Sequence, residues 1–263
     1  MLKNYDVIVV GAGHAGSEAA AASANLGSST LLITMDLTKI AQMSCNPAIG
    51  GIAKGQIVRE IDALGGYTAL VTDKATIQFR MLNRSKGPAM WSPRAQCDRM
   101  KFSLEWRKYL ESLKNLDFFQ DKVNQLIIED NSLKGVITQM GFKFYSKCVV
   151  LTNGTFLNGL MHIGATKLEG GRMAEPPSVG LTEQLVKHGF IKGRMKTGTP
   201  ARIDGRSIDF SKLEAQDGDI NPSAFSYFNS DCSLRKQRPC YIAHTNISVH
   251  ELLRQNFEFS PLF

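Results

Sequence analysis

Residues 5–34 read YDVIVVGAGHAGSEAAAASANLGSSTLLIT, and this stretch decides the fold. Residues 5–10 are mostly apolar and β-branched, as in a parallel strand that is covered on both faces. The alanine-rich stretch 17–26 predicts a helix that Gly27 ends, and residues 30–34 predict a second buried strand. Together they make one β-α-β unit, which predicts an α/β protein with a Rossmann-type sheet.

The turn between the first strand and the helix carries a glycine pattern. Gly11 permits the tight turn, Gly13 lets the backbone approach a pyrophosphate, and Gly16 lets helix and strand pack closely. The helix N-terminus then faces the anion. We therefore predict that a dinucleotide pyrophosphate is bound by the loop Gly11, Ala12, Gly13, His14, Ala15 and Gly16.

The glycine pattern does not decide which dinucleotide binds. The usual fingerprint ends with an acidic residue at the close of the second strand, where it binds ribose hydroxyls. In this chain Thr34 stands there, and Asp36 follows two residues later. Threonine can hydrogen-bond a hydroxyl but adds no charge, so this pattern leaves both NAD and FAD open.

Two later stretches favour FAD. Short alternating segments at 116–119, 125–129, 133–139 and 143–151 predict a small antiparallel β meander that rejoins the main sheet, an insert found in flavoproteins. The stretch 149–155, VVLTNGT, resembles the strand and Thr-Gly turn of two-domain flavoenzymes. An NAD dehydrogenase would more often continue with regular β-α repeats.

The rest of the chain is predicted more coarsely. Residues 35–60 open as a loop and become helical from about Gly55, and a further helix is predicted at about 94–113. We predict an FAD-binding domain over 1–195 that lacks its C-terminal return. The start of an inserted β-rich domain is predicted over 196–263, where Gly, Pro, Asp, Asn and Ser become frequent and a short strand is expected at 240–244.

The apolar end of the chain, without a helix stop, suggests a truncated protein. No apolar run approaches the roughly 20 residues that span a bilayer, so we expect a cytoplasmic protein without membrane contact. The net charge of +7 suits a polyanion, although a solvated basic surface explains it equally well. Cysteine and histidine spacings predict no metal site, and a calcium-like stretch at 217–228 has Pro222 in place of the required glycine.

The stretch 42–51, QMSCNPAIGG, is more specific. It closely resembles the tRNA uridine 5-carboxymethylaminomethyl modification family, MnmG or GidA, and the resemblance covers effectively the whole chain. Further matching stretches are 60–66 (EIDALGG), 77–83 (IQFRMLN), 85–89 (SKGPA), 94–96 (RAQ), 196–200 (KTGTP) and 239–242 (PCYI).

The resemblance implies a function. Such a protein would be an FAD enzyme that, with a GTPase partner, builds a carboxymethylaminomethyl group on C5 of the wobble uridine (U34) of certain tRNAs. Methylene-tetrahydrofolate would donate the one-carbon unit, NADH would reduce the flavin, and the working unit would be a homodimer.

The resemblance also implies roles for particular residues. Gly11 to Gly16 would hold the FAD pyrophosphate, the backbone of Val123 would meet the adenine edge, and Ser178 would complete the FAD contacts. The alternatives are a core valine at a strand end and a turn serine. Cys45 is the candidate catalytic residue, as a nucleophile on C6 of uracil or as a thiol near the flavin, and its alternative is a small buried thiol.

The remaining candidates are weaker. Lys86 and Lys196 flank turns suited to anions and are hypotheses for contact with tRNA phosphate or FAD, whereas solvated surface charges explain most of the basic residues. Packing is predicted for the other cysteines, Cys97, Cys148, Cys232 and Cys240.

Members of the family are well over twice this length. Relative to them, this chain would lack an NAD-binding segment with a second functional cysteine and a C-terminal helical domain for tRNA and the partner. Two other hypotheses therefore stay open, a non-catalytic FAD-binding remnant and a related folate- and FAD-dependent tRNA methyltransferase.

Overall fold

The computed structural model describes residues 4–229 and 236–260. In it β1 (Tyr5–Val10), α1 (His14–Asn25) and β2 (Thr30–Thr34) follow one another, and β1 and β2 pair in parallel with Val9 opposite Leu32. The β-α-β unit predicted from residues 5–34 is therefore confirmed. The chain has the predicted α/β class, with a mainly parallel sheet and smaller antiparallel ones.

The main sheet has six strands in the order β6-β2-β1-β9-β8-β7. β6 (Leu116–Gln120), β2, β1 and β9 (Lys143–Leu151) are parallel, whereas β7 (Val123–Glu129), β8 (Ser132–Thr138) and β9 are antiparallel neighbours. The predicted meander is thus confirmed for its last three segments. The prediction is wrong for residues 116–119, because β6 pairs with β2 at the edge of the sheet opposite to β7.

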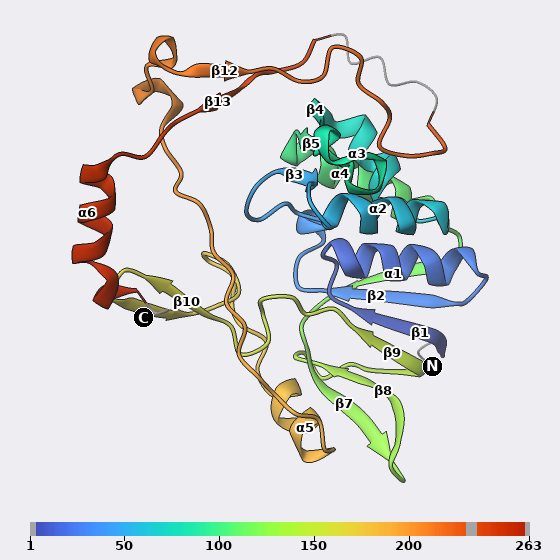
Figure 1. Ribbon diagram of the computed structural model, residues 1–263. Coiled ribbons are helices and arrows are strands. Elements are labelled where there is room, and N and C mark those ends of the chain that lie inside the picture. The colour runs from blue at the N-terminus through green and yellow to red at the C-terminus, as the bar shows by residue number, and fades with distance from the viewer. Residues whose placement is uncertain (1–3, 230–235, 261–263) are drawn as a thin grey trace.

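Three helices lie over the face of the sheet that α1 covers (Figure 1). They are α2 (Lys54–Ala63), α3 (Thr68–Ala75) and α4 (Arg99–Glu111). The helix predicted at 94–113 begins later, because the Asp98 carboxylate caps it by accepting hydrogen bonds from the amides of Met100 and Lys101, both at 3.0 Å.

Residues 94–97 belong instead to a strand, β5 (Ser92–Cys97). β5 lies between β3 (Ala48–Gly50) and β4 (Thr76–Leu82) in an antiparallel sheet. The loop predicted from residue 35 therefore contains a strand as well as a 3₁₀ turn at Leu37–Lys39. Alternation is hard to see in three-residue β3, which explains why the sequence pattern did not predict it.

The buried side chains form one cluster on each face of the main sheet. Val9 and Leu32 point to the helical face, where they join Phe102 and Trp106 of α4. Their neighbours along β1 and β2 point to the other face, namely Ile8, Val10, Leu31 and Ile33. There they pack against side chains of the meander: Val123, Leu126, Val136 and Phe144. Strands covered on both faces are what the continuous apolar runs of β1 and β2 predict.

The chain after β9 forms smaller elements. β10 (Leu160–Ile163) and β11 (Thr166–Glu169) make a hairpin, and α5 (Leu181–Lys187) lies beside β7. Residues beyond α5 then rise past the sheet to the pair of β12 (Glu214–Gln216) and β13 (Cys240–Ile242), and α6 (Ile247–Gln255) follows (Figure 1). The strand expected at 240–244 is shorter than predicted, and the domain division at 195 stays a prediction.

Two carboxylates, those of Asp62 and Asp73, attach residues 225–229 to the helices. Asp62 of α2 is fully buried and accepts hydrogen bonds from the Ser226 hydroxyl and the Tyr227 amide, both at 2.7 Å. Asp73 of α3 accepts from the amides of Phe225 (2.6 Å) and Ser226 (3.1 Å). Burial raises the pKa of Asp73, although these hydrogen bonds oppose the shift.

The cysteines differ in their surroundings. Cys97 is buried, as predicted, and Cys240 is half-buried on β13. The packing predicted for Cys148 is wrong, because this residue of β9 is exposed where the described chain does not cover the strand. Cys232 lies outside the described residues. Within residues 4–229 and 236–260, no helix combines the length and apolar character needed to cross a bilayer.

Candidate functional site

The glycine loop joins β1 to α1, and close contacts require two of its three glycines. Gly11 has φ +97°, and a Cβ there would lie 2.6 Å from the carbonyl oxygen of Thr152. A Cβ on Gly16 would lie 1.8 Å from the carbonyl oxygen of Gly11. Both positions therefore exclude any side chain.

Gly13 is different, because a Cβ there would meet no atom of the described residues within 4 Å. Packing within the chain therefore does not require glycine at this position. A pyrophosphate that approached the loop here would require it, since a methyl group would project into the space above the loop.

The N-terminus of α1 is open to an anion. Gly13 caps the helix without a side-chain hydrogen bond, and the first turn contains no acidic residue. Amide groups at such a helix start lack partners within the helix and attract negative charge. Gly13 and this helix start together fit the pyrophosphate of FAD, and Gly13, His14, Ala15 and Gly16 would hold it.

Thr152, at the end of β9, fixes the loop from the adjacent strand. Its hydroxyl lies 2.9 Å from the carbonyl oxygens of both Val10 and Gly11, and its amide donates to the Val10 carbonyl at 2.9 Å. The side-chain oxygen of Asn153, the next residue, is buried and has no hydrogen-bond partner among the described residues. The strand and turn at 149–155 thus end directly against the glycine loop and present an unused acceptor there.

The residues after β2 do not supply a free acid. Asp36 accepts hydrogen bonds from the amide and hydroxyl of Thr38 at 2.8 and 2.6 Å, and it lies 3.5 Å from the Lys39 ammonium group. These contacts, with that of the Thr38 hydroxyl the largest, lower the pKa of Asp36. Asp36 is thereby engaged in the local turn at Leu37–Lys39 rather than presented to a ribose.

The structure brings together the two residues assigned to the far end of FAD. Val123 is the first residue of β7, and Ser178 precedes α5. Both are buried, and the Ser178 hydroxyl donates to the Val123 carbonyl at 3.3 Å. Their FAD contacts stay predictions.

The Cys45 loop, residues 41–47, is tied directly to the glycine loop. The Ala41 amide donates to the Ala12 carbonyl at 2.7 Å, and Nε2 of His14 lies 3.2 Å from the Ala41 carbonyl oxygen. Burial, with a smaller contribution from the Lys54 charge, lowers the pKa of His14 to about 4. The ring is therefore neutral at pH 7, and Nε2 carries the hydrogen that it donates to Ala41.

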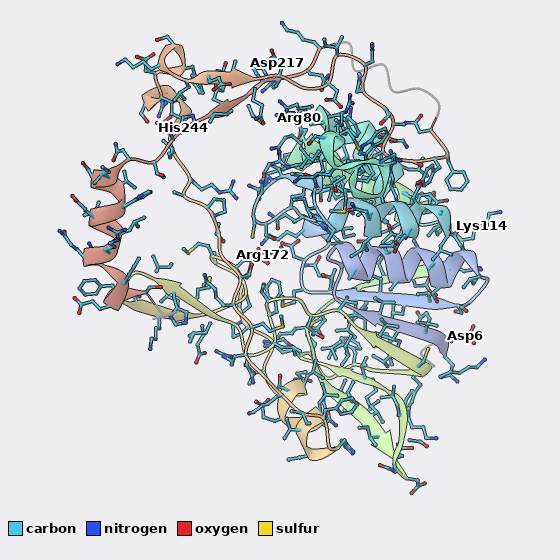
Figure 2. All side chains as sticks on the ribbon, in the orientation of Figure 1. Asp6, Arg80, Lys114, Arg172, Asp217 and His244 are labelled. Carbon is cyan, nitrogen blue, oxygen red and sulfur yellow. The ribbon has the colours of Figure 1, made fainter. Side chains whose placement is uncertain are left out.

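Three side chains from later segments contact the Cys45 loop. The sulfur of Cys45 lies 3.9 Å from the Thr199 hydroxyl. Arg202 donates from Nη2 to the carbonyls of Ser44, at 3.2 Å, and Cys45. Arg172 donates from Nη1 to the Gln42 side chain at 2.8 Å, and it lies on this side of the sheet, near its carboxyl-end loops (Figure 2).

Sequence reasoning missed both arginines, because each contacts the Cys45 loop across more than 100 residues and no local pattern signals it. The resemblance at 196–200 was the available signal, since Thr199 lies in that stretch. Lys196 is exposed in the same stretch, and Lys86 is exposed in the 3₁₀ turn Arg84–Lys86. Their anion contacts stay hypotheses. Among the described residues, no group of His, Cys, Asp and Glu could hold a metal ion.

A parallel sheet with a glycine loop and an open helix N-terminus at its carboxyl end defines a dinucleotide-binding α/β protein of the Rossmann type. Comparison with known families narrows this class. The family described as Glucose inhibited division protein A (GIDA) matches residues 6–263. The chain belongs to this family.

Individual relatives agree with this assignment. The chain is 63% identical over its whole length to the Flavobacterium johnsoniae tRNA uridine 5-carboxymethylaminomethyl modification enzyme MnmG, of which it covers 42%. It superposes on GidA of Aquifex aeolicus with a TM-score of 0.95 and 44% identity over 99% of this chain and 44% of that one. A GidA-related protein of Thermus thermophilus is more distant, with a TM-score of 0.52 and 25% identity over 72% of this chain and 70% of that one.

Proposed function

We propose that this chain is the FAD-binding part of an enzyme that, with a GTPase partner, adds a carboxymethylaminomethyl group to C5 of the wobble uridine of certain tRNAs. NADH is the proposed reductant, methylene-tetrahydrofolate the proposed one-carbon donor, a homodimer the proposed working unit, and the cytoplasm the proposed location. Membership in the GidA family and the name of the Flavobacterium johnsoniae relative support this proposal.

One observation carries the proposal: the 2.7 Å hydrogen bond between the Ala41 amide and the Ala12 carbonyl. It joins the loop that carries the candidate thiol to the loop that would hold the FAD pyrophosphate. The contact therefore supports a site in which the Cys45 loop adjoins the proposed cofactor site.

FAD, when bound, supplies the redox chemistry. The residues of this chain bind and orient it: the amides at the start of α1 face the pyrophosphate, and Ser178 holds the Val123 carbonyl at the proposed adenine end. Cys45 presents its thiol from the adjoining loop. A thiolate that adds to C6 of uracil makes C5 nucleophilic, which is the activation that a substitution at C5 requires.

The test compares Cys45→Ser with Cys148→Ser, which alters an exposed thiol on β9. Each protein is titrated with FAD and then incubated with unmodified tRNA, the GTPase, NADH and methylene-tetrahydrofolate, and the wobble nucleoside is analysed by mass spectrometry. We expect both variants to bind FAD like the unaltered protein and only Cys45→Ser to lose modification.

Undiminished modification by Cys45→Ser would remove this thiol from the chemistry. FAD binding without modification by the unaltered protein would favour the non-catalytic alternative. A 5-methyluridine product would instead indicate the related folate- and FAD-dependent tRNA methyltransferase.

A further inference from the structure

Two arginines of distant segments contact the Cys45 loop, Arg172 through the Gln42 side chain and Arg202 through the backbone. Arg172 is itself fixed within the first part of the chain, since it lies 3.7 Å from the Glu175 carboxylate and its guanidinium carbon lies 5.4 Å from the centre of the Phe156 ring. Its hydrogen bond to Gln42 therefore connects the start of the loop to the segment that contains Phe156 and Glu175.

Arg202 contacts the other end of the loop in a different way. A single nitrogen, Nη2, donates to two successive carbonyls, those of Ser44 and Cys45. Successive carbonyls of an extended chain point to opposite sides, so the two can meet one donor only where the backbone turns, and the chain does bend at Cys45. Hydrogen bonds from a charged donor are stronger than neutral ones.

The bend determines where the Cys45 side chain points. With both carbonyls directed at Arg202, the sulfur lies 3.9 Å from the hydroxyl of Thr199, three residues before Arg202 in the chain. One segment of the chain therefore contacts Cys45 twice: Thr199 contacts its side chain, and Arg202 contacts its backbone.

We propose that Arg202 is a positioning residue for Cys45: its guanidinium holds the Ser44 and Cys45 carbonyls and so keeps the sulfur beside Thr199. The importance of this position rests on the proposed function, in which Cys45 supplies the reactive thiol. Because Arg202 lies beyond residue 195, the proposal makes this later segment part of the Cys45 site.

The experiment measures the rate at which iodoacetamide alkylates Cys45 in the folded chain, with each cysteine followed by peptide mass spectrometry. Arg202→Met keeps the aliphatic stem and removes the donors, and Arg202→Lys keeps a charged donor. Arg206→Met is the matched control, because the exposed Arg206 pairs with Asp204 at 2.7 Å. The exposed Cys148 serves as a reference thiol within each molecule.

We expect Arg202→Met to increase the Cys45 rate several-fold relative to Cys148, Arg206→Met to leave it unchanged, and Arg202→Lys to restore most of the original rate. Thr199→Val, which removes the hydroxyl beside the sulfur, should change the Cys45 rate while leaving that of Cys148 unaltered. These shifts would support the proposal without any measurement of turnover.

An unchanged Cys45 rate in Arg202→Met would overturn it, and so would an equal rise at Cys148, which indicates general loosening. Failure of Arg202→Lys to restore the rate would also count against it. Because alkylation needs no tRNA, these outcomes are separate from the modification assay that tests Cys45 itself.

Discussion

The hydroxyl of Ser178 donates a 3.3 Å hydrogen bond to the backbone carbonyl of Val123, 55 residues earlier in the chain. The contact joins the start of β7 to the turn before α5, and both residues are buried. It brings two residues that are far apart in sequence together at the proposed adenine end of FAD. The carbonyl keeps a second lone pair, so this bond is compatible with a further contact from the adenine.

Ser178→Ala should weaken FAD binding about three- to tenfold, because one neutral hydrogen bond contributes roughly 1 kcal/mol and its loss leaves Val123 less well fixed. Flavin fluorescence titration measures the change. Ser132→Ala, at an exposed position on β8, is the control and should bind like the unaltered chain. Equal FAD affinities for the two variants would show that Ser178 does not contribute to cofactor binding.

Gly13→Ala and Gly16→Ala should separate ligand binding from folding. An added Cβ at Gly13 meets open space, so Gly13→Ala should keep the thermal unfolding midpoint and lose FAD affinity by at least about tenfold, as the methyl group obstructs the pyrophosphate. Gly16→Ala forces the 1.8 Å contact with Gly11 and should destabilise the apo chain by about 2–4 kcal/mol. Calorimetry without FAD measures the stability of each variant. A Gly13→Ala chain less stable than the Gly16→Ala chain would contradict the packing of the loop.

The glycine loop was predictable because it is local: strand, turn and helix follow one another, and close contacts within the chain require glycine at positions 11 and 16. β6 was misassigned because a short strand signals neither its partner nor its direction, and β2, its partner, lies more than 80 residues earlier. The contacts of Arg202 lie beyond local patterns for the same reason. Asp98, by contrast, was an available helix-start signal, since the N-cap preference for aspartate is local.

His14 should make the unfolding free energy depend on pH. Its pKa is about 4 in the folded chain and 6.5 as the ordinary value, so the unfolded chain binds the extra proton between these limits. The stability that the neutral ring contributes is therefore present above pH 6.5 and is lost as pH falls toward 4. Between these two pH limits, His14 should change the unfolding free energy by about 3 kcal/mol.

His14→Gln keeps an N–H donor within reach of the Ala41 carbonyl and does not titrate. Urea unfolding at several pH values should show the unaltered chain losing stability relative to this variant as the pH falls from 6.5 to 4. Since all other titrating groups are shared, they cancel in this comparison. A constant difference across that range would show that His14 is not held neutral.

Asp62 should be a main attachment of residues 225–229 to the helices. The fully buried carboxylate accepts two hydrogen bonds, and Asp62→Ala would leave the Ser226 hydroxyl and the Tyr227 amide without an acceptor, at a cost of about 2–4 kcal/mol. Ser226→Ala removes one donor to the carboxylate and the acceptor of the Phe228 amide, 3.1 Å away, and should cost less, because the carboxylate keeps its bond from Tyr227. The double variant should lose less unfolding free energy than the two single variants lose together, by about 1 kcal/mol or more, since both single changes break the same bond. Urea unfolding of the four proteins measures this coupling, and strict additivity would mean that the Asp62–Ser226 bond does not stabilise the fold.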